Sequence, residues 1–314
     1  MTLLAAIICV RMASSRLPGK ALCVYDEANQ KPNLQCIIER VLTSRYEPAV
    51  IVSTPTDAAD DPIEEFVFKY KNSINIYRGI TDLQLYRGDP VNVVKQFDGA
   101  LKQYASEADY VWRVMADCPL VDVGLADWRV DVLSRNKADV MTIIQPEPTY
   151  AAQASIWSKA AWDYCARMSS GSMLEHPGEF IYEHLGEFKT LHEPGPENIY
   201  YQDIRTELDT PEDLEFFRAI WQKYPMDTAE EFGWGGLPEK TFSAYGALRW
   251  LSFHPEIVAI NQHIEMKTKS THLHGHHRAR DWMCKGCGHT VAVKINDALA
   301  VQCQKCGEER RFYP

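Results

Sequence analysis

Short apolar runs alternate with segments of helical periodicity over residues 3–220, and this alternation constrains the fold more than any other feature of the sequence. It is typical of the α/β class, in which helices wrap a mostly parallel sheet. The first apolar run, Leu3–Val10, is short and lacks a preceding basic segment, so we expect a buried strand there and not a signal peptide. Further strands are expected at residues 49–53, 74–77, 110–115 and 140–144. Helices are expected at residues 33–42, with Asn33 as the cap, at residues 91–104, from Asp61, and from Thr210, which is expected to cap its helix.

Charge is distributed unevenly along the chain, which indicates two units with different roles. Residues 240–314 contain 11 basic and 6 acidic side chains, whereas residues 1–239 contain 22 basic and 37 acidic side chains. A glycine-rich run, Gly233–Pro238, is expected to lie in the connection between the two units. We therefore predict an α/β domain at residues 1–224, a linker with a helical and histidine-rich segment at 225–280, and a small β domain at 281–314.

The composition is that of a globular protein, with 46% apolar residues and no apolar run near the roughly 20 residues of a membrane helix. Because no targeting segment is recognised, we expect a cytoplasmic location without membrane insertion. In that reducing compartment five dispersed cysteines are predicted to be reduced core residues. They are Cys9, Cys23, Cys36, Cys118 and Cys165.

A polar loop with three cations follows the first predicted strand. The cations are Arg11, Arg16 and Lys20. Loops at the carboxyl ends of strands are where α/β sheets bind ligands, and amides with Arg and Lys side chains can neutralise phosphate oxygens. The loop lacks the Gly-Lys-Ser/Thr of a P-loop. Charge alone is compatible with a polyphosphate site and with a solvated basic loop.

The run Ile7–Lys20 (IICVRMASSRLPGK) resembles the signature of the cytidylyltransferases of the spore coat polysaccharide type, relatives of the enzymes that make CMP-Kdo and CMP-sialic acid. The resemblance continues in order through residues 37–40, 51–54, 60–63, 86–88, 92–94, 117–122 and 208–214. It implies a Rossmann-like, GT-A-like nucleotidyltransferase fold and magnesium-dependent transfer of CMP from CTP with release of pyrophosphate. Ala13 and Ala116 depart from the family pattern, which has glycine at both positions.

The resemblance also assigns the catalytic residues. Arg11, Arg16 and Lys20 are expected to neutralise the triphosphate and the leaving pyrophosphate, as developing charge in this chemistry requires. Asp117 and Asp209 are expected to hold magnesium, which prefers carboxylate oxygens. Without the resemblance, Asp117 reads equally well as a turn residue and Asp209 as an acid near a helix cap.

Further residues are assigned to the nucleotide and to the acceptor. Ser14, Ser15, Arg87 and Gly88 are expected to join the three loop cations in binding CTP, and the acceptor is expected at Glu175, His176 and Tyr182. Relatives place an acceptor-binding or dimer-forming excursion in the latter region. These three residues are therefore candidates either for acceptor contacts or for surface positions at a homodimer contact.

Four C-terminal cysteines have the spacing of a zinc ribbon. They form two Cys-x-x-Cys pairs, Cys284 with Cys287 and Cys303 with Cys306. Four thiolates suit structural Zn²⁺ and leave no open catalytic position, whereas two disulfides are the alternative. Residues 290–295 and 299–302 alternate between the pairs and are expected to form a β-hairpin.

The remaining motifs leave the role of the C-terminal region open. His272, His274, His276 and His277 suit either a second metal or a flexible polar linker. A modest positive charge without a dense basic and aromatic stripe argues against nucleic acid and favours a protein partner. For the whole chain we expect CMP activation of a sugar, sugar acid or phosphorylated small molecule for surface polysaccharide or glycoconjugate synthesis. The alternatives are a glycosyltransferase using a nucleotide sugar and an inactive zinc-ribbon scaffold.

Overall fold

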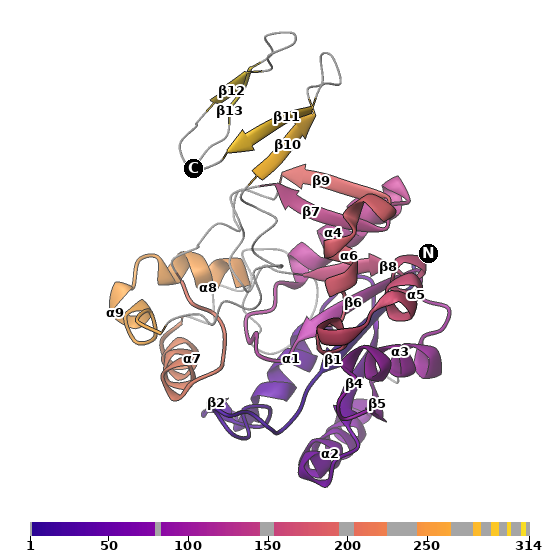
Figure 1. Ribbon diagram of the computed structural model, residues 1–314. Helices are drawn as coiled ribbons and strands as arrows, with labels where there is room; N and C mark the ends of the chain where they lie inside the picture. Colours follow the sequence, from indigo (N-terminus) through magenta and orange to yellow (C-terminus); the bar gives the residue numbers. More distant parts are fainter. Residues whose placement is uncertain are drawn as a thin grey trace.

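A seven-stranded, mostly parallel sheet forms the centre of the protein, whose structure is a computed structural model (Figure 1). The structure describes residues 2–78, 83–144, 154–194, 204–224, 244–264, 279–283, 290–294, 300–302 and 309–311. Across the sheet the strands follow the order β5-β4-β1-β6-β8-β7-β9. Their bounds are β1 Leu4–Cys9, β4 Ala49–Pro55, β5 Leu83–Gly88, β6 Tyr110–Met115, β7 Val140–Ile144, β8 Ser155–Ser158 and β9 Thr190–Pro194. Only β8 runs antiparallel to its neighbours β6 and β7 in this sheet.

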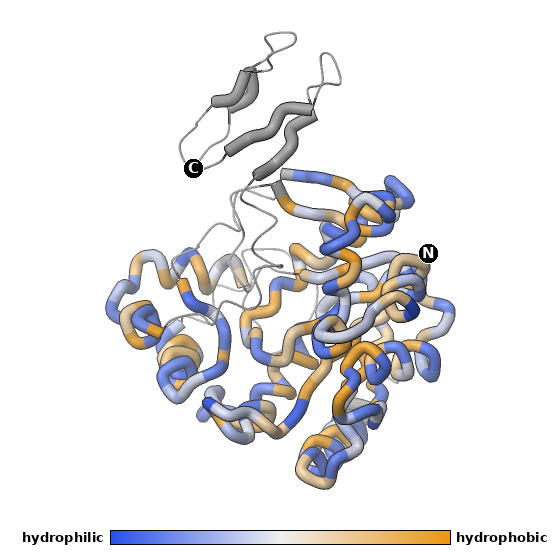
Figure 2. Tube along the Cα trace, viewed as in Figure 1, coloured by the Kyte–Doolittle hydropathy of each residue, from blue (hydrophilic) through white to orange (hydrophobic). Residues whose placement is uncertain are grey.

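Helices cover both faces of the sheet because successive strand residues point to opposite sides. On β1, Ala6 and Ile8 pack with α1, α2 and α4, whereas Ala5 and Ile7 pack with α3, α5 and α6. Figure 2 shows hydrophobic colouring along the central strands and alternating colours along the helices. The helices are α1 Asn33–Val41, α2 Asp61–Arg78, α3 Val93–Tyr104, α4 Val123–Asn136, α5 Lys159–Met168 and α6 Glu179–Glu183.

A third hydrophobic cluster joins the last helices to the small hairpin of β2 (Val24–Asp26) and β3 (Lys31–Pro32). It contains the buried faces of α7 (Pro211–Lys223), α8 (Ala244–Leu251) and α9 (Pro255–Val258). Figure 1 shows these three helices together at one side of the sheet. Every helix in the described part of the chain is too short or too polar to span a bilayer.

The α/β class, the mostly parallel sheet and most of the predicted elements are confirmed. The strand expected at residues 74–77 is wrong, because these residues belong to α2 and the edge strand is β5. Ile74 and Tyr77 continue the spacing of three and four set by Ile63, Val67 and Tyr70, and extending a formed helix costs little. Strand β8 and helix α5 were not among the elements predicted from the sequence.

Two further expectations need correction. Asn33 is the first residue of α1 and not its cap, a position taken by Pro32. The hairpin expected between residues 290–295 and 299–302 is also wrong. Strand β11 (Thr290–Lys294) pairs with β10 (Ala279–Met283), and β12 (Ala300–Gln302) pairs with β13 (Glu309–Arg311), both antiparallel.

Candidate active site

The loop after β1 is held in place by its own hydrogen bonds and by one buried carboxylate. The Gly19 amide donates to the Met12 carbonyl oxygen (3.2 Å), and the Leu17 amide donates to Ser14 Oγ (3.3 Å). The Met12 amide donates to Oδ1 of Asp60 (2.6 Å), which is buried at the entry to α2. These hydrogen bonds hold the loop so that Arg16 and Lys20, in its C-terminal half, lie near the end of β6.

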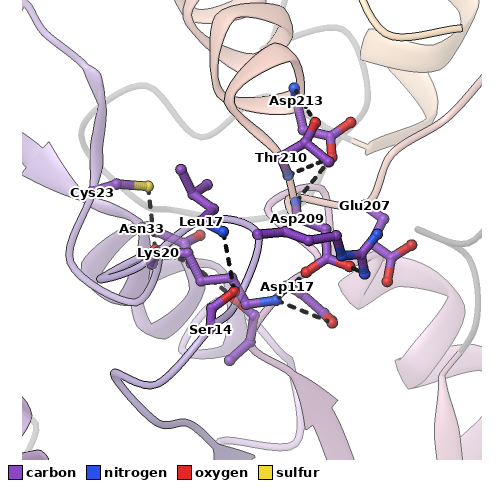
Figure 3. A network of polar contacts seen from close by, with 12 residues as sticks. Ser14, Leu17, Lys20, Cys23, Asn33, Asp117, Glu207, Asp209, Thr210 and Asp213 are labelled. Carbon is purple, nitrogen blue, oxygen red and sulfur yellow. Dashed lines mark hydrogen bonds and ion pairs between the residues drawn. The ribbon is translucent and has the colours of Figure 1, made fainter. Parts of the chain in front are cut away.

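Two cations of this loop meet two carboxylates from distant parts of the chain. Lys20 Nζ lies 2.8 Å from Asp209 Oδ1 and 3.7 Å from Asp117 Oδ2, and the Arg16 guanidinium pairs with Asp209 Oδ2. Figure 3 shows Lys20, Asp117 and Asp209 pointing toward one another. The Asp209 side chain is 8% exposed, so these interactions lie largely out of water. Four of the five residues predicted to be catalytic are therefore brought together.

Asp117 lies in the turn that follows β6. Its carbonyl oxygen accepts the Leu208 amide (2.8 Å), which joins the turn to the segment that carries Asp209. The fully buried Asn33 side chain donates to the carbonyl oxygens of Ala116 (2.8 Å) and Lys20 (3.3 Å). Asn33 thus fixes the cationic loop to the acidic turn. From the sequence Asn33 is expected only to cap a helix, because a polar side chain at a helix start usually bonds to nearby backbone amides.

Asp209 precedes α7, whose N-terminus is closed by a capping box. Asp213 Oδ2 accepts the amides of Asp209 and Thr210 (2.9 Å each), and Thr210 Oγ1 accepts the Asp213 amide (3.3 Å). This confirms the helix start expected at Thr210. The helix dipole also favours negative charge at this end of α7.

Asp213 in turn is clamped by a buried arginine. Arg205 donates from Nε to Asp213 Oδ1 (2.8 Å) and from Nη2 to Oδ2 (2.9 Å). Burial opposes the charge of Arg205, but the hydrogen bonds and charges of Asp213 and Glu207 raise its pKa above the ordinary value. The guanidinium therefore stays charged. A capping acid three residues after Thr210 is visible in the sequence, whereas its arginine partner carries no local signal.

The other predicted nucleotide residues lie on the exposed part of the loop and at the end of β5. Arg11 and Ser15 are exposed on the loop. Arg87, at the end of β5, is held by the carboxylates of Asp61 (2.6 Å) and Glu64, which start α2. At Gly88 a Cβ atom would lie 2.8 Å from Cγ and 3.2 Å from Cα of Gln96, so glycine permits the close packing of β5 on α3.

The predicted acceptor residues belong to the layer of α3, α5 and α6. Glu175 is exposed in a short 3-10 helix, and His176 is partly exposed just after it. The Tyr182 ring packs edge-on against Trp157, with centroids 6.2 Å apart. Arg113 of β6 donates to the Pro177 carbonyl oxygen (3.2 Å), so this segment is tied to the strand that leads to Asp117.

The acidic pair has the chemistry of a divalent-cation site. Both carboxylates already share one cation, the Lys20 ammonium, and their oxygens are the ligands that Mg²⁺ prefers. Among the described residues no group of three or more His, Cys, Asp or Glu side chains forms a metal site. Two carboxylates fit magnesium in particular, because this ion takes its other ligands from water and substrate phosphates.

The cysteine and histidine predictions have different outcomes. Five cysteines are free thiols, and burial raises the pKa of Cys9 and Cys23 to about 11 and that of Cys36 to about 12. The four ribbon cysteines and the four histidines of residues 272–277 lie outside the described residues. By position in the chain, Cys284 and Cys287 fall between β10 and β11, and Cys303 and Cys306 fall between β12 and β13.

The comparisons with known proteins agree with one another. A family model described as cytidylyltransferase matches residues 5–232. A curated relative, the spore coat polysaccharide biosynthesis protein SpsF of Bacillus subtilis (strain 168), is 23% identical over 235 residues, which are 69% of this chain and 85% of that protein.

Two solved structures share the fold. A cytidylyltransferase from Leptospira borgpetersenii matches with a TM-score of 0.67 and 21% identity, covering 85% of this chain and all of the other. CMP:2-keto-3-deoxy-manno-octonic acid synthetase in complex with CTP matches with a TM-score of 0.50 and 16% identity, covering 71% of this chain and all of the other.

Proposed function

The chain belongs to the cytidylyltransferase family, and we propose that it transfers CMP from CTP to a sugar-type acceptor with release of pyrophosphate, assisted by Mg²⁺. That it is a CTP-dependent nucleotidyltransferase, as the resemblance implied, follows from the family. One observation carries the site assignment. Lys20, Arg16, Asp117 and Asp209 converge from three separate segments at the carboxyl ends of β1 and β6. Ligand sites of open α/β sheets lie at this edge.

The cations of the loop neutralise charge during the reaction. The acceptor oxygen attacks the α-phosphorus, the bond to the bridging oxygen breaks, and its electron pair leaves with pyrophosphate. Lys20 and Arg16 pair with Asp209 in the free protein, and both side chains can exchange these partners for phosphate oxygens. Arg11, which is exposed at the start of the loop, can reach a bound triphosphate without breaking an ion pair of the cluster.

The carboxylates have the complementary role. Asp117 and Asp209 would hold Mg²⁺, which supplies charge neutralisation at the phosphates. The Asp209 side chain is the less exposed of the two, and the Asp209 backbone amide donates a hydrogen bond to Asp213 Oδ2. We assign Asp209 to orienting both the metal and the acceptor oxygen. If Asp209→Asn retains near-normal turnover at saturating magnesium, this role is wrong.

The acceptor site is assigned from the sequence resemblance, and the C-terminal zinc site from the spacing of its cysteines. Glu175, His176 and Tyr182 are proposed to contact a sugar or sugar-acid acceptor, and the similarity to SpsF supports surface polysaccharide synthesis. Two antiparallel pairs, β10–β11 and β12–β13, frame the two Cys-x-x-Cys sequences, which supports structural Zn²⁺ at the four cysteines. A homodimer, a protein partner for this region and a cytoplasmic location stay predictions.

Product analysis tests the proposed function. The purified full chain is incubated with each of the four NTPs and a panel of sugars, sugar acids and sugar phosphates. Pyrophosphate release is measured and products are identified by mass spectrometry. CTP-dependent pyrophosphate with a CMP-conjugated product supports the proposal. Release of a nucleoside diphosphate from a nucleotide sugar would indicate a glycosyltransferase, and the absence of any CTP-dependent product would contradict the proposal.

A further inference from the structure

A helical extension lies beyond the part of the chain that the family model matches. It comprises residues 244–264, with α8 and α9, whereas the match ends at residue 232. Leu248, Leu251 and Ile257 are buried in the same hydrophobic cluster as Phe216 and Phe217 of α7. The extension therefore packs directly on the helix whose N-terminus carries Asp209.

One polar side chain of the extension enters this cluster. Asn261 is fully buried, and its Nδ2 donates to Asp213 Oδ1 (2.9 Å) and to the Arg205 carbonyl oxygen (3.2 Å). A single amide group thus joins both ends of the segment 205–213, which carries Asp209. Both neighbours are acceptors, so the amide must present its donors to them.

The Asp213 carboxylate transmits this contact to the site. It is completely buried and accepts five hydrogen bonds, from Arg205 Nε and Nη2, Asn261 Nδ2, and the amides of Asp209 and Thr210. Asn261 is therefore one residue removed from the Asp209 backbone. Without the Asn261 donor, Asp213 Oδ1 keeps one of these five hydrogen bonds, from Arg205 Nε, whereas Oδ2 keeps three. The carboxylate, and with it the Asp209 amide, is then held less firmly.

The burial of Asn261 is costly for a role in packing alone. Its Oδ1 is buried and accepts no hydrogen bond within the described part of the chain. A leucine of similar size would fill the same space without that cost. The two donations of Nδ2 are what compensates for burying this amide.

We infer that Asn261 is a positioning residue for Asp209, and that the α8–α9 extension is thereby a functional part of the active site. The inference rests on the proposed function for the role of Asp209 itself. It extends the active site beyond the part of the chain that the family model matches, to a buried residue that acts on Asp209 through Asp213. The contacts on which it depends are internal to the protein.

The test compares Asn261→Leu and Asn261→Ala with Ile257→Val in the full chain. Both Asn261 variants lose the donors, but they differ in the volume that they leave, whereas Ile257→Val removes one buried methyl group of the same extension and none of these hydrogen bonds. We measure kcat, KM for CTP and the half-saturating magnesium concentration at a temperature well below every Tm. Hydrogen exchange of the segment 205–214 is measured without ligands.

Both Asn261 variants should lower kcat or weaken magnesium activation by roughly tenfold or more, as the loss of a residue that orients a metal ligand usually does. KM for CTP should change by less than about twofold, because the loop is untouched. The Asp209 and Thr210 amides should exchange roughly tenfold faster. Ile257→Val should match the wild type in all of these, whatever its Tm.

Three results would overturn the inference. The first is wild-type kinetics in both Asn261 variants, and the second is a rate loss that follows Tm across all three variants. The third is global unfolding of both Asn261 variants, which would make Asn261 purely structural. Failure of the proposed function is seen separately, as absence of CTP turnover in the wild type. In that case the exchange of residues 205–214 still decides whether Asn261 positions Asp209.

Discussion

Replacing Lys20 by methionine tests whether the shared ammonium serves the reaction or only the fold. Lys20 lies within 4 Å of both carboxylates and its side chain is 19% exposed. Removing one preorganised charge from a transition state of this kind costs about 10²–10³-fold in rate. We expect kcat/KM for CTP to fall by that amount.

Stability should fall as well, but only modestly. Arg16 still pairs with Asp209 after the substitution, so the loss is that of a partly buried ion pair, about 1–3 kcal/mol. For a domain of this size each kcal/mol lowers Tm by about 2–4 °C. Magnesium should raise Tm more in Lys20→Met than in the wild type, because the carboxylates no longer share the ammonium with the metal.

Lys31→Met is the matched control. Lys31 has the same side-chain exposure, 19%, and pairs with Glu39 at 2.9 Å, away from the site. Pyrophosphate release and thermal melting are measured for both variants. A kcat/KM in Lys20→Met within tenfold of the wild type, or an equal rate loss in Lys31→Met, would refute the assignment of Lys20.

The remaining predictions concern other parts of the molecule. Asp209→Asn should lower kcat by about 10²-fold or more, measured at saturating magnesium. Gly178→Ala should lower stability by about 2 kcal/mol or more in thermal or urea unfolding, because a Cβ would lie 2.1 Å from the Trp157 ring at φ +91°. Gly171→Ala, with φ +58° and open space around it, should lose less. Burial raises the pKa of Cys9 from 9.0 to about 11, so between these values the folded state binds more protons than the unfolded state, and stability should fall as pH rises from about 9 to 11. The fall should be smaller in Cys9→Ala but not abolished, because burial also raises the pKa of Cys23 and Cys36. The purified full chain should contain one zinc per molecule by elemental analysis, and chelation should expose four thiols to a thiol reagent.

The sequence predicts the sheet and the loop because their signals are local. The Thr210 cap, the strands at residues 110–115 and 140–144 and the class of the fold can be read from spacing and turn chemistry, and the structure confirms them. The misplaced strand at residues 74–77 shows the limit of such reading. A run of four residues with three apolar side chains suits a strand or the last turn of a helix, and only the tertiary position of β5 decides between them.

Some residues of the candidate site could be predicted from the sequence, and others could not. The family resemblance assigns motifs that are distant in sequence to one site, and Lys20 and Asp209 lie 189 residues apart. For this reason the sequence could predict Arg16, Lys20, Asp117 and Asp209. Asn33 and Asn261 could not, because each acts on chain that is distant in sequence. The Asn33 contact with Ala116 spans 83 residues and the Asn261 contact with Asp213 spans 48 residues. Neither asparagine lies in a pattern that distinguishes it from a helix cap or a loop residue.

The balance of charge in the site explains how an acidic domain can bind an anionic nucleotide. In the free protein Arg16 and Lys20 are offset by Asp117 and Asp209, so the cluster carries little net charge of its own. Under the proposed function CTP brings negative charge and Mg²⁺ brings positive charge. Phosphate oxygens would then replace the carboxylates at the cations, and Asp117 and Asp209 would be left to hold the metal. Phosphate binding to the cations would free the carboxylates for the metal, and metal binding to the carboxylates would free the cations for phosphate. The nucleotide and the metal would therefore favour one another's binding. Acidic side chains farther away are screened by salt and have little influence on nucleotide binding.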